Sequence, residues 1–472
     1  NTDAVLWTSE KMFWPILYTV LTTICAFLSL IFSGIKPIID FGWMMTVGLL
    51  VSLSVTFTLL PSILNVLGKK NTNFESEKKS KITSFLSKVA QKNTKTIFAS
   101  TILAIIVSIV GITKLEVENS FINYFDKKTE IYKGMKLIDE QLGGTTPLDV
   151  IVKFSKKTKE NETDDDFESW DDEEKDESKY WFTRNKIDRI IEVHDYLESL
   201  EAVGKVISFA SMVRVAEDLN NGKKLQGLEM GVLYTKIPDT IKKEIVDPYI
   251  SIKDNEARIS LRVLDSKEDL RRNELIKKIN YDLENELGLE REEFKLAGVL
   301  ILFNNLLQSL FKSQILTLGV VMAGITLMFL ILFRNITLSL IGVVPNFMAA
   351  FLILGIIGLL RIPLDMMTIT IAAITIGIAV DNSIHYIYRF KEEFKKTNDY
   401  NQTLEKCHNT VGVAILNTSI TIVFGFSILV LSNFIPTIYF GVFTGIAMML
   451  AMISVLTLLP KLILIFKPFA NG

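Results

Sequence analysis

Eight apolar stretches of this chain are each long enough to cross a lipid bilayer, and strongly charged segments lie between several of them. A helix needs about 20 residues to cross the hydrocarbon core. Apolar residues make up 49% of the 472 residues and charged residues 22%. The separation of apolar and charged residues into different segments predicts a polytopic α-helical membrane protein. The predicted spans are residues 13–33, 38–67, 96–115, 315–333, 337–360, 366–388, 411–431 and 438–466.

The basic residues of the loops predict which ends of the spans face the cytoplasm. Residues 68–95 carry eight Lys against two Glu, and the loop after the sixth span carries five Lys or Arg. Loops rich in Lys and Arg stay in the cytoplasm, and a single up-and-down threading places both loops on one side. Residues 116–313 are therefore expected on the other, extracytoplasmic side.

The basic loop contains a short amphipathic stretch. Its apolar residues fall at helical spacing, with three Lys around them: Ile82, Phe85, Leu86 and Val89. This pattern predicts a helix lying on the inner leaflet and leading into the third span. A solvated linker is an equally good interpretation of the sequence.

The outside region, residues 116–313, is large enough to form its own core. Apolar patterning predicts strands and helices in the order βαββαβ, a split βαβ arrangement, and so an α+β porter-like domain. Neither cysteine lies in it, so no disulfide supports it. His194 falls in a polar helix and is predicted to be a surface residue.

An acidic insertion, residues 156–178, interrupts this pattern after the first strand. Twelve acids and a single Lys lie within residues 160–177, which predicts a solvated segment. Cation binding is a weaker interpretation, because no EF-hand spacing is present. The chain also lacks Walker, Rossmann, zinc-finger and nucleophile-elbow motifs, which disfavours an ATPase, a hydrolase, a metal site and a nucleic-acid-binding surface.

An internal repeat is visible at a constant offset. Residues 16–61 align without a gap with residues 415–460, and fifteen of the 46 positions are identical, including shared Pro, Gly and Thr positions. Shared Pro, Gly and Thr at one offset rarely arise by chance in apolar helices. The sequence therefore predicts a duplication, in which both copies have the same membrane orientation.

The repeat suggests how the chain is organised. The second copy is preceded by three spans and the outside domain, so a complete first copy would need roughly 300 further residues upstream. The expected parts are the last two helices of a first transmembrane repeat (1–67), a basic cytoplasmic linker (68–95), one transmembrane helix (96–115), the outside domain (116–313) and a five-helix bundle (314–468).

The sixth predicted span contains the ionisable residues of greatest interest. Asp381 and His385 are four residues apart and so share a helix face. A carboxylate within a bilayer costs about 2.5–3.5 kcal/mol on insertion scales, so such a group commonly has a function. Asp381 is predicted to load and release a proton, with His385, whose ordinary pKa is about 6.5, as a relay.

Several nearby residues are expected to support this pair. Asn382 and Ser383 lie beside Asp381, and Gly377, one turn earlier, would let a neighbouring helix approach. A purely structural alternative also exists, in which Asp381 only forms hydrogen bonds with the next span. The candidate partners there are Asn417, Thr418 and Thr421.

These features together resemble the resistance–nodulation–division (RND) exporters, in the MMPL-type branch that handles hydrophobic and amphiphilic substrates. The likeness covers nearly the whole chain except the acidic insertion, and the last five spans also resemble a sterol-sensing module. The passages that carry it are Gly377–Arg389 (GIAVDNSIHYIYR), Glu118–Phe154, Gln308–Pro345 and the two Phe-Gly…Leu-Leu-Pro helices.

The resemblance implies twelve spans, two outside domains and proton antiport in the inner (plasma) membrane, with no cofactor beyond the proton gradient. Asp381 matches the coupling position of the family's tenth helix. Many relatives have Tyr after this Asp, whereas Asn382 stands here, so the usual Asp–Tyr pairing does not carry over.

Three functions follow from the resemblance as expectations. A secondary transporter for lipid-like substrates leads, ahead of a lipid- or sterol-binding sensor without pumping and a helper in protein export. The expected partners are a hydrophobic substrate, membrane lipids, the upstream half of the transporter and an oligomeric or periplasmic partner.

Overall fold

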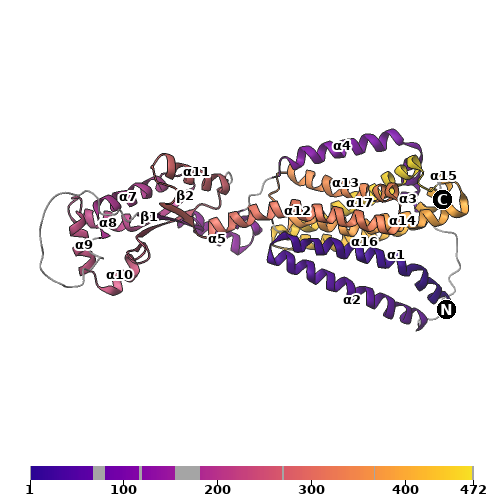
Figure 1. Ribbon diagram of the computed structural model, residues 1–472, viewed down its shortest axis with the longest axis horizontal. Coiled ribbons are helices and arrows are strands. Elements are labelled where there is room, and N and C mark those ends of the chain that lie inside the picture. Colours follow the sequence, from indigo (N-terminus) through magenta and orange to yellow (C-terminus); the bar gives the residue numbers. More distant parts are fainter. Residues whose placement is uncertain are drawn as a thin grey trace. The chain divides into compact units, whose positions relative to one another are not determined.

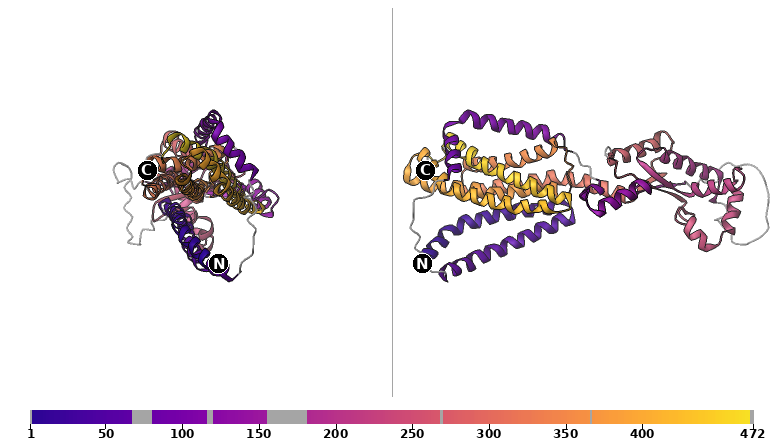
Figure 2. Two further views of the ribbon diagram at one scale, coloured as in Figure 1. Left: turned by 90° about the vertical axis from the view of Figure 1, so that its right-hand side faces the viewer. Right: turned by 180° about the vertical axis from the view of Figure 1, so that it is seen from behind.

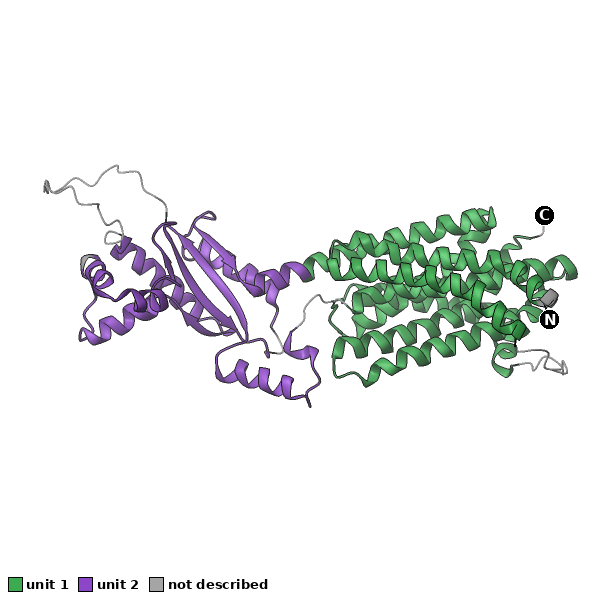
Figure 3. Ribbon diagram, turned by 90° about the horizontal axis from the view of Figure 1, so that it is seen from below, with its two compact units in different colours: residues 1–119, 307–472 green, residues 120–306 purple. Residues whose placement is uncertain are grey.

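The computed structural model describes residues 2–66, 80–115, 120–154, 181–267, 270–365 and 367–469. These fall into two compact units, residues 1–119 with 307–472 and residues 120–306 (Figure 3). The predicted acidic insertion, residues 156–178, lies outside the described residues.

The first unit contains the membrane helices, and the prediction of eight spans is confirmed. Only helices satisfy every backbone polar group within one segment in lipid, which is why uncharged apolar runs fold this way. Two spans end in a 3-10 turn and one begins with it: η1 (Ser29–Ser33), η4 (Ile428–Leu431) and η3 (Thr368–Thr370). The helices are α1 (Thr2–Leu28), α2 (Lys36–Val66), α4 (Thr94–Ile112), α12 (Val299–Phe333), α13 (Ile336–Leu359), α14 (Ile371–Thr397), α16 (Val411–Ser427) and α17 (Ile435–Phe466).

The internal repeat is confirmed by matching contacts in its two copies. In each copy a helix, a 3-10 turn and a second helix follow one another (α1–η1–α2 and α16–η4–α17). A Cβ on Gly42 would lie 2.6 Å from the carbonyl oxygen of Phe27, and a Cβ on Gly441 would lie 2.6 Å from that of Phe426. Each of these Phe residues also meets a second Phe edge to face. Equivalent glycine and phenylalanine contacts therefore occur at the same turn in both copies.

Helices α4 and α13 pack closely through small residues (Figure 1). A Cβ on Gly111 would overlap the carbonyl oxygen of Gly355, and a Cβ on Gly358 would overlap that of Gly111. Lipid tails are as apolar as Leu, so close approach of backbones, rather than hydrophobicity, holds such helices together.

Gly111→Leu is expected to separate α4 from α13 and to lower the apparent melting temperature of the purified protein by roughly 2–10 °C, the size of an overpacking defect. Gly319→Leu is the matched control, because nothing lies within 4 Å of a Cβ at that position. Equal melting temperatures for the two variants would show that this glycine contact does not stabilise the bundle.

Two short helices cover one end of the membrane unit, α3 (Lys81–Lys92) and α15 (Tyr400–Asn409). Helix α3 confirms the predicted helix and excludes the linker interpretation for residues 81–92. It packs on α15 and α17 through Thr83, Ser87 and Ala90, while Ile82 and Phe85 remain exposed. Contact of these two apolar side chains with the inner leaflet stays a prediction.

The second unit is built on an antiparallel sheet with one buried face. Its strands are β1 (Thr146–Lys153), β2 (Val203–Ile207), β3 (Ile250–Ser251), β4 (Glu256–Val263) and β5 (Phe294–Ala297). The order is β2–β4–β1–β5, with β3 paired to β4. Alternate residues of β1 are fully buried, and they pack in one core with apolar residues of α7 (Arg184–Glu198) and α11 (Arg272–Asn285).

The elements of this unit follow one another as β1–α7–β2, then β4–α11–β5. Strands β1 and β2 are both antiparallel to β4, which lies between them, so the β1–α7–β2 unit is split by another strand. Beyond the predicted elements, the helices α8 (Phe209–Leu219), α9 (Gly227–Lys236) and α10 (Asp239–Ile245) and the strand β3 lie between β2 and β4. Two further elements precede the sheet, η2 (Ile122–Tyr124) and α5 (Glu130–Gln141).

The prediction that His194 is a surface residue is wrong. Its side chain is buried, and its Nδ1 lies 2.9 Å from the hydroxyl of Ser208, which caps α8. His194 follows Val193 and lies one turn after Ile190, on the face of α7 that enters the core. Burial lowers the pKa of this imidazole, and the nearby Arg214 lowers it further.

Candidate functional site

Helix α14, which carries the predicted site, is the most enclosed of the membrane helices. It packs against α1, α13, α16 and α17. In the most hydrophobic 18-residue stretch of the span that contains α14, 83% of the residues are buried, compared with 17% in the span that contains α16. Figure 2 shows α1 and α2, in indigo, on one side of the bundle, with α2 at the edge. Side chains on α14 are therefore surrounded mainly by protein.

The described residue that forms a hydrogen bond with Asp381 is Thr23, on α1. The Thr23 hydroxyl lies 3.5 Å from Oδ1 of Asp381 and 3.2 Å from the carbonyl oxygen of Gly377. It also lies 2.9 Å from the carbonyl oxygen of Thr19 in its own helix. One hydroxyl proton cannot satisfy all three acceptors at once, so the contact with Asp381 is one of several alternatives for Thr23.

Gly377 allows α1 to approach α14 closely, as the sequence predicted for a neighbouring helix. A Cβ on Gly377 would lie 2.5 Å from the Cβ of Ala26, so any larger residue would push the two helices apart. The close approach places Thr23, one turn before Ala26, beside Asp381. At one end of the same helix pair, Lys11 and Glu392 form an ion pair of 3.4 Å.

Ser383 and Asn382 are both buried, as part of the same turn of α14. The Ser383 hydroxyl accepts a hydrogen bond of 2.8 Å from the side-chain amide of Asn346 on α13. The amide oxygen of Asn346 is buried and has no hydrogen-bond partner among the described residues. Asn346 was not predicted, although an Asn following Pro345 inside a span was a visible signal.

His385 is only partly buried, and none of the hydrogen bonds in the described part of the chain joins it to Asp381. The histidine held in a network is His408 on α15. Its Nδ1 lies 3.1 Å from the hydroxyl of Tyr386, and its Nε2 lies 2.9 Å from the carbonyl oxygen of Leu456. The structure therefore gives no direct Asp381–His385 relay, and that role stays a prediction.

The structure does not bring Asn417, Thr418 and Thr421 to Asp381. All three are exposed on α16, and the two Thr hydroxyls donate to carbonyl oxygens of their own helix. At the equivalent positions of the first repeat copy, Thr19 and Thr22 are buried. The same repeat positions are therefore buried on α1, which packs against α14 and α2, and exposed on α16.

Asp381 forms no ion pair with any described Lys, Arg or His. The buried acid Asp365, which precedes the same span, has more hydrogen-bond donors, because it accepts hydrogen bonds from the backbone N–H groups of Met367 and Thr368 and from the Thr368 hydroxyl. Asp365 is locally satisfied in the turn before η3, whereas Asp381 has one weak donor. A carboxylate without a counter-ion at this depth is costly.

One group of possible metal ligands occurs among the described residues, in the second unit. His194, Asp195 and Glu198 offer ligand atoms within 4.8 Å of one another. Arg214 forms ion pairs with both of the acids, so a cation already neutralises this group. The cluster therefore fits a surface ion-pair network better than a metal site.

Comparison with known proteins gives a family match over most of the chain. The model of the MMPL family matches residues 3–97 and 192–470. A relative in Methanocaldococcus jannaschii, MJ1562, named as a membrane protein, is 25% identical over 394 residues. That alignment covers 80% of this chain and 93% of the relative.

Two solved structures share the fold. SecDF of Thermus thermophilus, described as a translocon-associated membrane protein, has a TM-score of 0.53 and 13% identity, and the match covers 98% of this chain and 50% of that one. The hedgehog release protein Disp of the water bear Hypsibius dujardini has a TM-score of 0.59 and 14% identity, covering 96% and 58%. This chain therefore spans about half the length of these structures.

Proposed function

This chain belongs to the MMPL family, and from that premise we propose that it is a proton-driven RND-type transporter that moves hydrophobic or amphiphilic molecules, such as lipids, across or out of the membrane. The observation that carries the proposal is the carboxyl group of Asp381, which lacks a counter-ion among the described residues and lies on the most enclosed span.

The contacts of Asp381 suggest how a proton would act on the helices. A carboxylate accepts the Thr23 hydrogen bond, whereas a neutral acid needs that bond less and can itself donate to another group. Thr23 can then return to the carbonyl oxygens of Gly377 and Thr19. Protonation would thus change the bond between α1 and α14 at their closest approach. A proton shifts two conformations only if it binds them unequally, and we propose that the Thr23–Asp381 contact supplies such a difference.

The uncovered face of α16 supports a two-fold arrangement. On α1, Thr19 and Thr22 are buried, and α1 packs against α14 and α2. By the repeat, a helix equivalent to α14 would cover Thr418 and Thr421 on α16. We infer that the upstream half of the transporter supplies this helix, so that Asn417, Thr418 and Thr421 serve a second site rather than Asp381.

Flux in liposomes tests the proposal against a lipid-binding sensor that does not pump. The purified protein is reconstituted, and movement of a fluorescent NBD-labelled lysophospholipid is followed with and without an imposed pH gradient. A transporter is expected to move the probe at least several-fold faster with the gradient, and an ionophore that collapses the gradient should remove the difference. Saturable binding of the probe with no effect of the gradient would support the sensor and contradict the proposal.

A further inference from the structure

Helix α5 in the second unit has an unusual distribution of polar and apolar side chains. Its only buried residue is an acid, Asp139. Its apolar side chains are instead largely exposed: Ile131 is 55% exposed, Ile138 43% and the C-cap Leu142 57%. A surface helix normally buries its apolar stripe and exposes its charges, so α5 is held to the domain by its polar side and presents apolar side chains outward.

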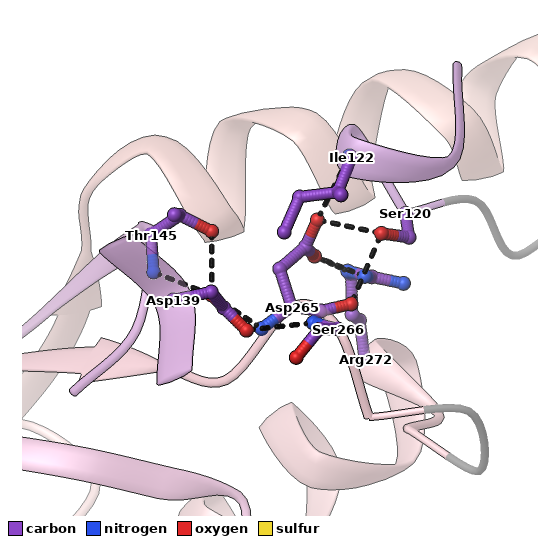
Figure 4. A network of polar contacts seen from close by, with 7 residues as sticks. All are labelled: Ser120, Ile122, Asp139, Thr145, Asp265, Ser266 and Arg272. Carbon is purple, nitrogen blue, oxygen red and sulfur yellow. Dashed lines mark hydrogen bonds and ion pairs between the residues drawn. The ribbon is translucent and has the colours of Figure 1, made fainter. Parts of the chain in front are cut away.

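The buried carboxylate fixes α5 firmly to the domain (Figure 4). Asp139 accepts hydrogen bonds from the backbone N–H groups of Thr145, Asp265 and Ser266 at 2.8–3.0 Å and from the Thr145 hydroxyl at 2.7 Å. Burial opposes ionisation of Asp139, but bonds from Ser266, Thr145 and Asp265 outweigh it and hold the pKa of this carboxyl below its ordinary value. At neutral pH Asp139 is therefore ionised, and its hydrogen bonds hold α5 on the domain.

A second buried acid holds the segment that precedes α5. Asp265 pairs with Arg272 and accepts hydrogen bonds from the Ser120 hydroxyl at 2.7 Å and from the backbone N–H of Ile122 at 3.3 Å. Figure 4 shows these groups gathered around the end of β4, next to the Asp139 bonds. Both ends of the segment from Ser120 to Thr145 are therefore anchored to the same part of the sheet.

Helix α5 has an apolar face and a charged face, as a helix at a membrane interface requires. Ile131, Met135, Ile138 and Leu142 follow one another at helical spacing and form a stripe, whereas Leu137, which is 61% exposed, lies outside it. Asp139 lies on the flank of this stripe, toward the domain. Lys133 and Glu140 lie roughly opposite it and are exposed. A helix of this kind can rest on an apolar surface while it stays bound to its own domain by one flank.

Three features favour lipid as that surface. The segment begins at Ser120, seven residues after Thr113, the C-cap of span α4, so about 25 Å of extended chain is the longest possible tether. Aromatic rings that favour membrane interfaces lie just before α5, where Phe121 stacks edge to face with Tyr124 and Phe125. Exposed Lys127 and Lys128 follow them and suit anionic headgroups.

We propose that α5 lies on the bilayer surface on the side of this domain, with its stripe of Ile131, Met135, Ile138 and Leu142 at the boundary of headgroups and acyl chains. Burying the exposed parts of such side chains is favourable in proportion to their apolar area. The helix then keeps the part of the domain to which residues 120–145 are bound next to the outer leaflet. Contact of α5 with lipid requires neither proton coupling nor transport.

Depth measurements on α5 test the proposal. Single Cys residues are placed at Ile138, in the stripe, and at Lys133, on the opposite face, in a background in which Cys25 and Cys407 are replaced by Ala. Each full-length variant is spin-labelled in nanodiscs of phosphatidylcholine and phosphatidylglycerol, and its accessibility to oxygen and to a water-soluble nickel complex is compared. The ratio of oxygen to nickel accessibility is expected to be several-fold higher at position 138 than at position 133.

Two results would overturn the proposal. Equal ratios at the two positions would place the stripe in water, and shielding of position 138 from both reagents would show that protein covers it instead.

The wild-type chain provides a test without substitutions. A phosphatidylcholine with a diazirine in its acyl chain is photolysed in the same nanodiscs, and peptides are analysed by mass spectrometry. Adducts are expected on residues 130–142, while the exposed helix α10 (Asp239–Ile245) serves as the control. The absence of adducts on α5, or equal labelling of α10, would contradict lipid contact.

Discussion

Asp381→Asn is expected to reduce gradient-driven transport of the lipid probe to the rate of protein-free liposomes while the protein still folds. Asn has the shape of Asp, and its amide oxygen can still accept the Thr23 hydrogen bond. It cannot bind and release a proton in the accessible pH range. If protonation of Asp381 drives the cycle, the substitution removes the coupling step itself and leaves the packing around Gly377 unchanged.

Asp365→Asn is the matched control for this variant. Asp365 is a buried acid in the same unit, but it accepts hydrogen bonds from Met367 and Thr368 in a local turn, and Asn can accept the same backbone bonds. This variant should keep most of the gradient-driven transport. Transport that survives in Asp381→Asn, or is lost equally in both variants, would argue against a coupling role specific to Asp381.

Arg272→Met is expected to open the segment that carries α5. The Arg272–Asp265 pair is almost completely buried, with side chains 5% and 2% exposed. Removing one partner of such a pair leaves an uncompensated buried charge and costs about 3–5 kcal/mol. At 1.4 kcal/mol for each tenfold change, amide hydrogen exchange in residues 120–142 of the full chain should become roughly two to four orders of magnitude faster.

An exposed ion pair in the same sheet provides the control. Arg258 pairs with Asp149 at 3.0 Å, but its side chain is 47% exposed, and such surface pairs contribute about 0–1 kcal/mol. Arg258→Met should therefore change exchange in residues 120–142 little. Similar exchange in the two variants would show that the Asp265 cluster does not anchor the segment.

The spans and the repeat could be predicted from the sequence because lipid imposes a strict rule on composition. The hydrocarbon core of a bilayer favours long, mostly apolar helices, and duplicated Gly and Phe positions keep the same turn contacts, as Gly42 and Gly441 show. Asp381 could be predicted for the same reason, since an acid in such a run stands out.

The partner of Asp381 could not be predicted, because it depends on the order of helices in space. The following span, α16, was the nearest polar candidate in sequence, but Thr23 lies 358 residues away. The two repeat copies differ at this position, where Thr23 in α1 corresponds to Ile422 in α16. That difference was a visible signal that the polar contact belongs to the first copy.

The burial of polar groups in the second unit could not be predicted from the sequence. His194 and Asp139 lie in helices whose sequences are rich in charge, yet both are buried because each bonds a specific loop or cap, Ser208 in one case and Thr145 to Ser266 in the other. Helical periodicity identifies apolar faces, but it does not show which polar side chain a neighbouring backbone will capture.

Proton movement measured in the transporting vesicles tests the central claim most directly. Proteoliposomes are loaded with a pH-sensitive dye, a pH gradient is imposed, and the NBD-labelled lysophospholipid is added. For the wild-type chain, addition of the probe should accelerate the collapse of the gradient in step with probe movement, and for Asp381→Asn it should not. Probe movement without any accompanying proton flux in the wild-type chain, or the same coupled flux in Asp381→Asn, would contradict the account.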